Sequence, residues 1–406
     1  MSDNIKDLVK KLKDNYLFQV SLGSKELFHS NLLAWLLEQK EKEKYVILEK
    51  FIKELTSLGI LVAKDSDLFT DLKISRETQK FDLTISWKFE DTSNSIYIEN
   101  KMKSIPTEDQ LIKYDAKIEN GVKLLLTPFK TKLEVKGWHN ITYSDQIIKV
   151  LQEVKALNIK FENDDVNHVV ERYIEFLQNL LQLINVLNLD HGSNDLFLKQ
   201  RYNFYPVTNG ELLMKELKDL RLHDLILKLL HQKISESLLS KVSKIKELKI
   251  VDNVNDLLNQ KGNILITSGF TQSSGISDIK ICVGNNILLC LQLQENTLKY
   301  GVEVFSKDLI SKCKEYADIL VENKLWFYDF DKNDPELLSG NGRNKKMYIL
   351  GNENKKFNSY GDTFIYLNKD MSSYREKTID DLTTFISNEV GKVYQDIDTL
   401  ESLFPK

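Results

Sequence analysis

The chain has 406 residues, of which 42% are hydrophobic and 29% are charged, and its formal net charge is -4. This length is more than one ordinary hydrophobic core supports, so two domains are expected, and the composition is that of a globular protein. The net charge excludes a uniformly basic nucleic-acid coat protein but allows a local basic groove.

The three cysteines, Cys282, Cys290 and Cys313, lack CxxC spacing. This pattern argues against a disulfide framework and a zinc finger, and it favours free thiols in a reducing compartment. The N-terminal segment has no apolar signal core, and no apolar run is long enough to cross a bilayer. We therefore expect a cytoplasmic protein that does not bind a membrane.

In the first half of the sequence, the spacing of the hydrophobic residues changes from the period of a helix to the period of a strand. Apolar residues at helical spacing predict an opening helix and two more helices, over about 25–39 and 44–58. A period of two then predicts three strands, over 72–78, 81–89 and 95–101. Further elements follow, namely a helix 106–119, strands 122–127 and 140–143, a helix to about 157 that Ser144 caps, and a helix 165–187. This order predicts an α/β domain with a mixed sheet flanked by helices.

A polar, turn-rich segment, Asn188 to Asn194, is the expected linker. It separates a first domain, 1–190, from a second domain, 195–406. The second half is an α+β domain by its own pattern, with helices near 210–247, 307–322 and 380–401 and strands near 264–267, 278–283, 287–293, 299–305, 325–330, 347–350 and 363–367. We expect it to recognise the substrate or a partner.

The strands 81–89 and 95–101 both alternate between an apolar and a polar face. Asp82 lies on the polar face of the first, with Phe81 and Leu83 on the apolar face, and Glu99 and Lys101 lie on the polar face of the second. A hairpin centred at residues 90 and 91 sets position 82 opposite position 99. Directly opposed side chains share a face, about 5 Å apart at Cβ, so the two carboxylates are expected to converge.

Two carboxylates at this short separation repel each other unless a cation lies between them. Mg²⁺ takes one or two carboxylates together with water and substrate phosphate, and Lys101 can supply a point charge beside it. The alternative that the spacing leaves open is a surface hairpin whose polar face is solvated.

Asp82, followed by Ile98-Glu99-Asn100-Lys101 on the next strand, resembles the D…(D/E)xK signature of PD-(D/E)XK nucleases. Phe81 stands where the proline of the name would be. The segments 26–37 (ELFHSNLLAWLL) and 109–114 (DQLIKY) are similar to a bacterial branch of that superfamily. The resemblance covers about 22–187.

The resemblance implies a restriction-endonuclease-like fold and a nuclease that uses Mg²⁺ or Mn²⁺ on DNA. It assigns metal binding to Asp82 and Glu99 with help from Glu26, and positioning of the nucleophilic water to Lys101. It implies that Gln110 assists catalysis, and that Tyr114, Lys103 and Lys113 support the site or contact nucleic acid. Local alternatives exist for Glu26, as an acid favoured by the helix dipole, and for Gln110, as a capping-box partner of Thr107.

A rival interpretation is a nuclease fold that binds nucleic acid or protein without cutting. A role in defence against foreign DNA follows by family analogy only. Homo-oligomerisation and a protein partner of the second domain are left open. An echo of the hairpin at 277–294 has glutamines where Glu99 and Lys101 stand, and we expect a plain β-hairpin there without chemistry.

Overall fold

A computed structural model divides the chain into two compact units, Met1–Ser193 with Leu212–Ile226, and Asn194–Glu211 with Leu227–Lys406. Each unit is described by itself. The structure describes residues 3–21, 26–62, 69–78, 81–89, 92–102, 108–115, 118, 120–131, 133, 135–187, 217–245, 248–271, 274–284, 286–294, 297–305, 312–323, 325, 337–338, 347–350, 355–361, 363–371, 374 and 378–404.

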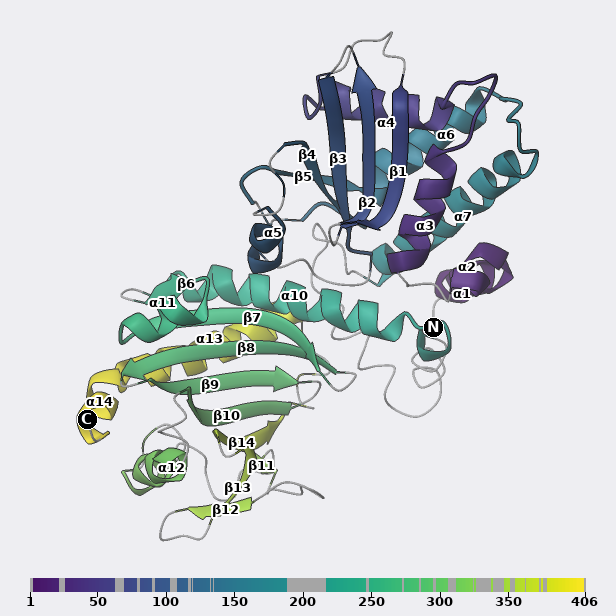
Figure 1. Cartoon of the computed structure of the whole chain (residues 1–406). Coiled ribbons are helices and arrows are strands. Elements are labelled where there is room, and N and C mark those ends of the chain that lie inside the picture. Colours follow the sequence, from purple (N-terminus) through teal and green to yellow (C-terminus); the bar gives the residue numbers. More distant parts are fainter. Residues whose placement is uncertain are drawn as a thin grey trace. The chain divides into compact units, whose positions relative to one another are not determined.

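The first unit contains five strands and the helices that cover them (Figure 1). The strands are β1 (Thr70–Thr78), β2 (Phe81–Phe89), β3 (Thr92–Asn100), β4 (Val122–Thr127) and β5 (Trp138–Thr142). The helices are α1 (Asp3–Asp14), α2 (Tyr16–Ser21), α3 (Glu26–Leu37), α4 (Val46–Ser57), α5 (Glu108–Asp115), the π-helix η1 (Tyr143–Ile147), α6 (Ile148–Ala156) and α7 (Asp165–Val186).

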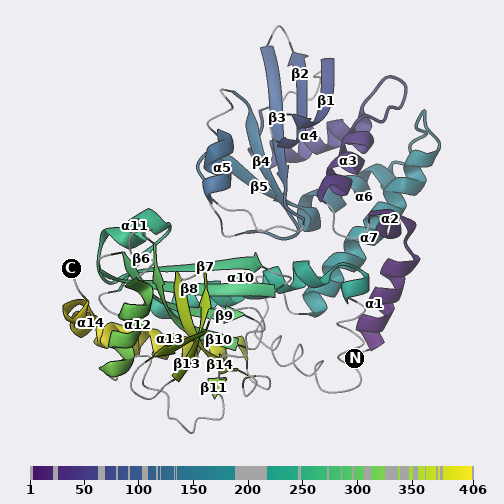
Figure 2. The same cartoon turned by 60° about the horizontal axis from the view of Figure 1, so that its bottom comes forward.

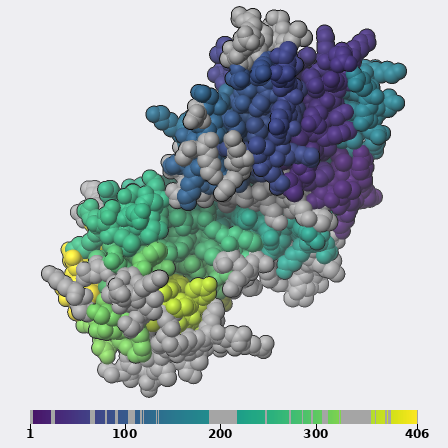
Figure 3. Space-filling model, in the orientation of Figure 1, coloured from purple at the N-terminus to yellow at the C-terminus, as the bar shows by residue number. Residues whose placement is uncertain are grey.

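The strand order in this sheet is β1-β2-β3-β4-β5. The first three strands pair antiparallel, whereas β3, β4 and β5 pair parallel, so the predicted mixed sheet is confirmed. Helix α3 contacts β1, β2 and β3, and α4 and α6 contact each other. Helices α3, α4 and α6 lie on one side of the sheet and α5 on the other (Figure 2). In the space-filling view, α1 to α3 (purple) and β1 to β3 (blue) form a continuous surface of this unit (Figure 3).

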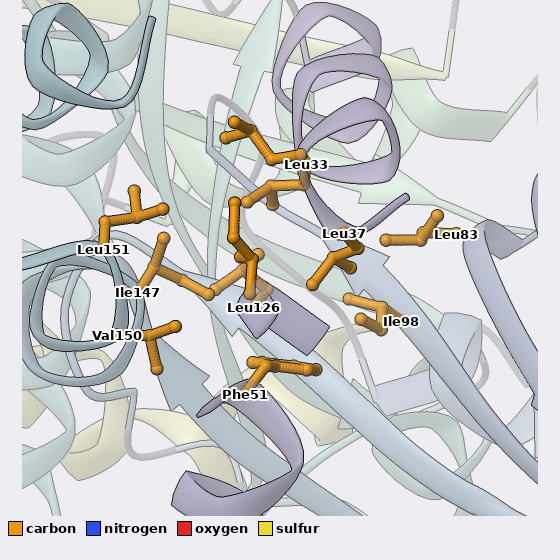
Figure 4. Close-up of a pocket in the computed structure, with 11 residues that line it drawn as sticks. Leu33, Leu37, Phe51, Leu83, Ile98, Leu126, Ile147, Val150 and Leu151 are labelled. Carbon is orange, nitrogen blue, oxygen red and sulfur yellow. The ribbon is translucent and has the colours of Figure 1, made fainter. Parts of the chain in front are cut away.

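The apolar faces of β2 and β3 form the core beneath α3 and α6. Leu83, Ile85, Ile96 and Ile98 are all at most 2% exposed, as the alternation predicts. A small apolar cavity of about 20 Å³ remains between these layers, lined by Leu33, Leu36, Leu37, Ile47, Phe51, Leu83, Ile98, Leu126, Ile147, Val150 and Leu151 (Figure 4).

The helix that follows β5 begins differently from the prediction. Its first turn is the π-helix η1, and its N-terminal cap is Thr142, whose side chain accepts a hydrogen bond from the backbone N–H of Asp145. The expected cap, Ser144, lies inside the π-helix. The amide side chain of Gln146 also accepts a hydrogen bond from the backbone N–H of Thr142, at 2.8 Å. Because of these two hydrogen bonds, the helix begins at Tyr143, before the expected cap at Ser144.

The second unit is built on a larger sheet with the order β12-β13-β14-β10-β9-β8-β7-β6, and β11 pairs with β14. The strands are β6 (Lys249–Val251), β7 (Asn263–Thr271), β8 (Ser274–Gly284), β9 (Ile287–Gln294), β10 (Thr297–Val304), β11 (Leu337–Leu338), β12 (Met347–Leu350), β13 (Lys355–Tyr360) and β14 (Phe364–Asp370). Its helices are α10 (His223–Val242), which belongs to this unit from Leu227 onward, α11 (Val254–Asn259), α12 (Cys313–Glu322), α13 (Ile379–Gln395) and α14 (Ile397–Leu403).

The second sheet agrees with most of the predicted strands. The hairpin at 277–294 is formed by β8 and β9, with Asp278 opposite Gln292. The sequence pattern did not predict the short elements β6, α11, β11 and β13, and the predicted strand 325–330 lies outside the described residues except for Leu325. Helix α10 begins later than predicted, directly after a turn in which Arg221 has a φ of 55°. In the described part of the chain, no helix is long and apolar enough to cross a membrane.

Candidate active site

The pairing of β2 with β3 brings the two signature segments side by side. The register sets Leu83 opposite Ile98 and Thr84 opposite Tyr97. Continued by one residue, it places Asp82 opposite Glu99, as the hairpin length predicts. The carboxylate of Asp82 accepts a hydrogen bond at its Oδ2 from the backbone N–H of Asn100, at 2.7 Å.

Glu99 and Lys101 form a buried ion pair at the end of β3. The Lys101 ammonium lies 2.7 Å from Glu99 Oε1. Glu99 is only 3% exposed and Lys101 8%. The backbone N–H of Lys101 donates to the carbonyl of Leu126 on β4, at 2.8 Å, which holds the residue against the sheet. A solvated hairpin face, the alternative from spacing, therefore does not describe this end of the strand.

Helix α5 covers the ion pair with the side chains of Gln110 and Tyr114. The Gln110 amide nitrogen donates to Glu99 Oε1 at 3.1 Å and to the Tyr114 hydroxyl at 3.0 Å. The spacing of four residues places Gln110 and Tyr114 on one helix face, as predicted. The other partner in the proposed capping box, Thr107, lies outside the described residues.

An aromatic cluster surrounds the start of β2. The Phe81 ring lies 5.1 Å from the Tyr97 ring, 5.4 Å from Tyr114 and 6.1 Å from Trp138, between ring centroids. Alternation predicted that Phe81 would share a face with Leu83, but its ring contacts Tyr97, which alternation places on the opposite face. The rings come from β3, α5 and β5, and they lie beside the Glu99 and Lys101 pair.

Three predicted residues are not brought to this cluster by the described contacts. Glu26 is the first residue of α3, but its side chain lies outside the described part of the structure, and so does all of Lys103. Lys113 is exposed on α5. Their roles remain predictions.

A group of buried polar residues that the sequence pattern did not predict lies behind the site. Asn100, Ser30, His29, Tyr143 and Tyr173 are each at most 1% exposed. His29 is fully buried, its Nδ1 lies 2.9 Å from the Tyr173 hydroxyl, and among the described residues its Nε2 has no hydrogen-bond partner. A sequence signal exists in retrospect, since His29 and Ser30 interrupt the apolar stripe of α3.

The donor set suits a magnesium-type ion better than a softer metal. Asp82 and Glu99 supply carboxylate oxygens, and Mg²⁺ needs only one or two of these when water and substrate phosphate complete its shell. Among the described residues, no group of three or more His, Cys, Asp and Glu side chains could hold a metal ion.

Residues 14–178 match the family model of the PD-(D/E)XK nuclease superfamily. This match confirms the resemblance for the N-terminal half of the chain, and the mixed sheet flanked by helices is consistent with the restriction-endonuclease-like fold. The PD-(D/E)XK segment contains β1 to β5 and all the candidate site residues, and it ends before the second unit. Comparisons with curated proteins and with solved structures gave no match.

Proposed function

We propose that the first unit is a divalent-metal-dependent nuclease that hydrolyses phosphodiester bonds in DNA. The observation that carries the proposal is the buried pair of Glu99 and Lys101 beside Asp82, on the two central strands of the PD-(D/E)XK segment. The superfamily match supports nuclease activity in general. The metal and the DNA substrate belong to the proposal.

A buried ion pair is hard to explain by stability alone. Removing two charges from water costs several kcal/mol per ion, and apolar residues of similar size are often equally stabilising or better. The pair is therefore better explained as a site in which a carboxylate and an ammonium are held ready for chemistry.

In this proposal, Asp82 and Glu99 bind Mg²⁺ or Mn²⁺, and Glu26 assists from the start of α3. The bound ion would acidify a water molecule and offset charge on the scissile phosphate. Gln110 fixes the direction of the Glu99 carboxylate, because its amide donates to Oε1, and Tyr114 holds Gln110 in turn. These two residues keep the carboxylate in place before substrate arrives.

Lys101 carries the only positive charge among the signature residues. Its ammonium is held by Glu99, in surroundings that exclude most water, and an electrostatic interaction is strongest there. We assign it to positioning the nucleophilic water and stabilising the charge that develops on the phosphate. Lys103 and Lys113 are assigned to phosphate contacts outside the site.

The second unit is proposed to recognise the substrate or a protein partner. All three cysteines are buried and none of them forms a disulfide, which is compatible with a reducing, cytoplasmic environment. A role in defence against foreign DNA rests on family analogy.

The test uses the full chain with single-stranded, linear and supercoiled DNA, with Mg²⁺ or Mn²⁺ and then with excess chelator. We expect metal-dependent cleavage that Glu99→Gln abolishes. The matched control is Glu49→Gln, which makes the same chemical change at an exposed position of α4 and should cleave normally. Calorimetric titration with Mn²⁺ separates binding from cleavage. If the wild type binds no divalent ion, and Glu99→Gln binds DNA unchanged, the first unit is a binding module and the proposal is wrong.

A further inference from the structure

We propose that Asn100, the residue between Glu99 and Lys101, is a positioning residue that aligns the metal-binding carboxylates through a buried hydrogen-bond network. The network consists of Asn100, Ser30, Tyr143, Tyr173 and His29, and is called the Asn100 network below. This inference rests on the proposed function, and the family resemblance assigned no role to any of these five residues.

Hydrogen bonds link Asn100 to neighbours in three directions. Its backbone N–H donates to Asp82 Oδ2 at 2.7 Å. Its side-chain nitrogen donates to the Ser30 hydroxyl at 3.0 Å, and its side-chain oxygen accepts from the Tyr143 hydroxyl at 3.1 Å. One residue of β3 is thereby linked to β2, α3 and η1.

The network continues from Tyr143 into α7. The Tyr143 hydroxyl interacts electrostatically with Tyr173 of α7. The Tyr173 hydroxyl in turn lies 2.9 Å from His29 Nδ1. Burial lowers the pKa of His29 to about 3, so the ring is neutral near pH 7.

The direction of Asn100 determines the directions of its two neighbours. Successive side chains on a strand point to opposite faces. Asn100 points toward α3, where Ser30 holds it, so Glu99 and Lys101 point toward α5, where Gln110 contacts Glu99. Fixing the Asn100 side chain therefore fixes the rotation of the strand end, and its N–H fixes the carboxylate of Asp82.

Stability gives little reason to place an asparagine here. The neighbouring inward residue, Ile98, lines the apolar core, and an apolar side chain at position 100 would need no hydrogen bonds. A buried amide is costly unless it is satisfied, and a satisfied network specifies one geometry more sharply than apolar packing does. Alignment of a metal site is a function that needs such geometry.

The test compares Mn²⁺ affinity with thermal stability in the full chain. Tyr143→Phe removes only the hydroxyl that donates to Asn100, and Asn100→Leu/Tyr143→Phe replaces both partners by apolar groups. The matched control is Tyr316→Phe, the same change at a buried tyrosine of the second unit. Calorimetric titration with Mn²⁺ is done well below the melting temperature of each variant, so that all are folded.

We expect Tyr143→Phe to weaken Mn²⁺ binding by about tenfold or more, the range typical for partners that orient metal ligands. The double variant should recover melting temperature, since no buried polar group is left unmatched, but should not recover Mn²⁺ affinity. Tyr316→Phe should bind Mn²⁺ like the wild type. If both network variants bind Mn²⁺ like the wild type, the Asn100 network only stabilises the fold and the inference is wrong. If the wild type itself binds no Mn²⁺, the proposed function fails and the inference fails with it.

Discussion

The ammonium of Lys101 lies 2.7 Å from Glu99 Oε1, and both side chains are more than nine-tenths buried. In the absence of a metal ion, the lysine is therefore the cation that neutralises the glutamate. A divalent ion bound by Glu99 would take over part of that neutralisation and leave the ammonium available to substrate. The ion pair of Glu99 and Lys101 therefore matters both for the stability of the metal-free protein and for its proposed chemistry.

The first prediction concerns Lys101→Met, which keeps the length of the side chain and removes its charge. Cleavage should fall by about 10²- to 10³-fold, the usual loss when one transition-state electrostatic group is removed. Mn²⁺ binding should survive, because both carboxylates remain. The metal-free protein should lose about 3–5 kcal/mol of unfolding free energy, since Glu99 is left buried without its partner charge.

Urea unfolding with and without Mn²⁺ measures this loss, and added metal should restore part of it. Lys53→Met, at an exposed position of α4, is the matched control and should change neither quantity. Wild-type cleavage rates in Lys101→Met would contradict the role assigned to this lysine.

The second prediction separates the two residues of α5. Gln110→Leu removes the amide that donates to Glu99 and should lower kcat by at least tenfold with little change in KM. Tyr114→Phe keeps the ring against Phe81 and removes only the hydroxyl that accepts from Gln110, so its effect on kcat should be smaller than that of Gln110→Leu. Steady-state kinetics on one DNA substrate checks the order. A larger loss in Tyr114→Phe would mean that the hydroxyl itself contacts substrate.

The third prediction concerns acid stability through His29. Burial lowers the pKa of this histidine from 6.5 to about 3. Between these values the unfolded chain binds a proton that the folded chain does not, so the unfolding free energy falls as pH falls from 6.5 toward 3. The contribution of one such proton is about 1.4 kcal/mol per pH unit.

This prediction is checked by urea unfolding of the wild type and His29→Gln between pH 7 and pH 4. The variant should be less stable at pH 7 because the hydrogen bond to Tyr173 changes, and its pH slope should be shallower by about one proton. His139→Gln, at an exposed position, should keep the wild-type slope. Equal slopes in wild type and His29→Gln would show that His29 is not the group responsible.

The fourth prediction uses the apolar cavity between α3, α6 and the sheet (Figure 4). Leu126→Ala would enlarge it and should cost about 2–5 kcal/mol of unfolding free energy, because contacts are lost and the site relaxes only partly. Val150→Ile adds one methylene toward the empty space and should stabilise the protein by about 0.5–1 kcal/mol. Denaturant unfolding measures both. Destabilisation by Val150→Ile would show that the cavity walls leave no room for the added group.

The sequence by itself determined the central hairpin and its register. Alternation along 81–89 and 95–101, with a polar loop between them, is sufficient to pair position 82 with position 99, because side chains on a strand repeat with a period of two. The helices of the first half are also visible in their apolar spacing, and the signature residues Asp82, Glu99 and Lys101 stand within about twenty residues of one another. The short elements β6, α11 and β13 escaped prediction because a few residues carry too little periodicity.

Only the tertiary structure decided that the polar end of β3 is buried. Alternation shows which residues share a face but not whether that face meets solvent or another element. Gln110 contacts Glu99, and Ser30 and Tyr143 contact Asn100, so residues that lie far apart in the sequence are joined. Such contacts depend on how helices pack on both sides of the sheet, and that packing depends on the shapes of many side chains at once. The candidate site residues can therefore be named from a short motif, whereas the buried hydrogen bonds around Asn100 are seen only in the folded chain.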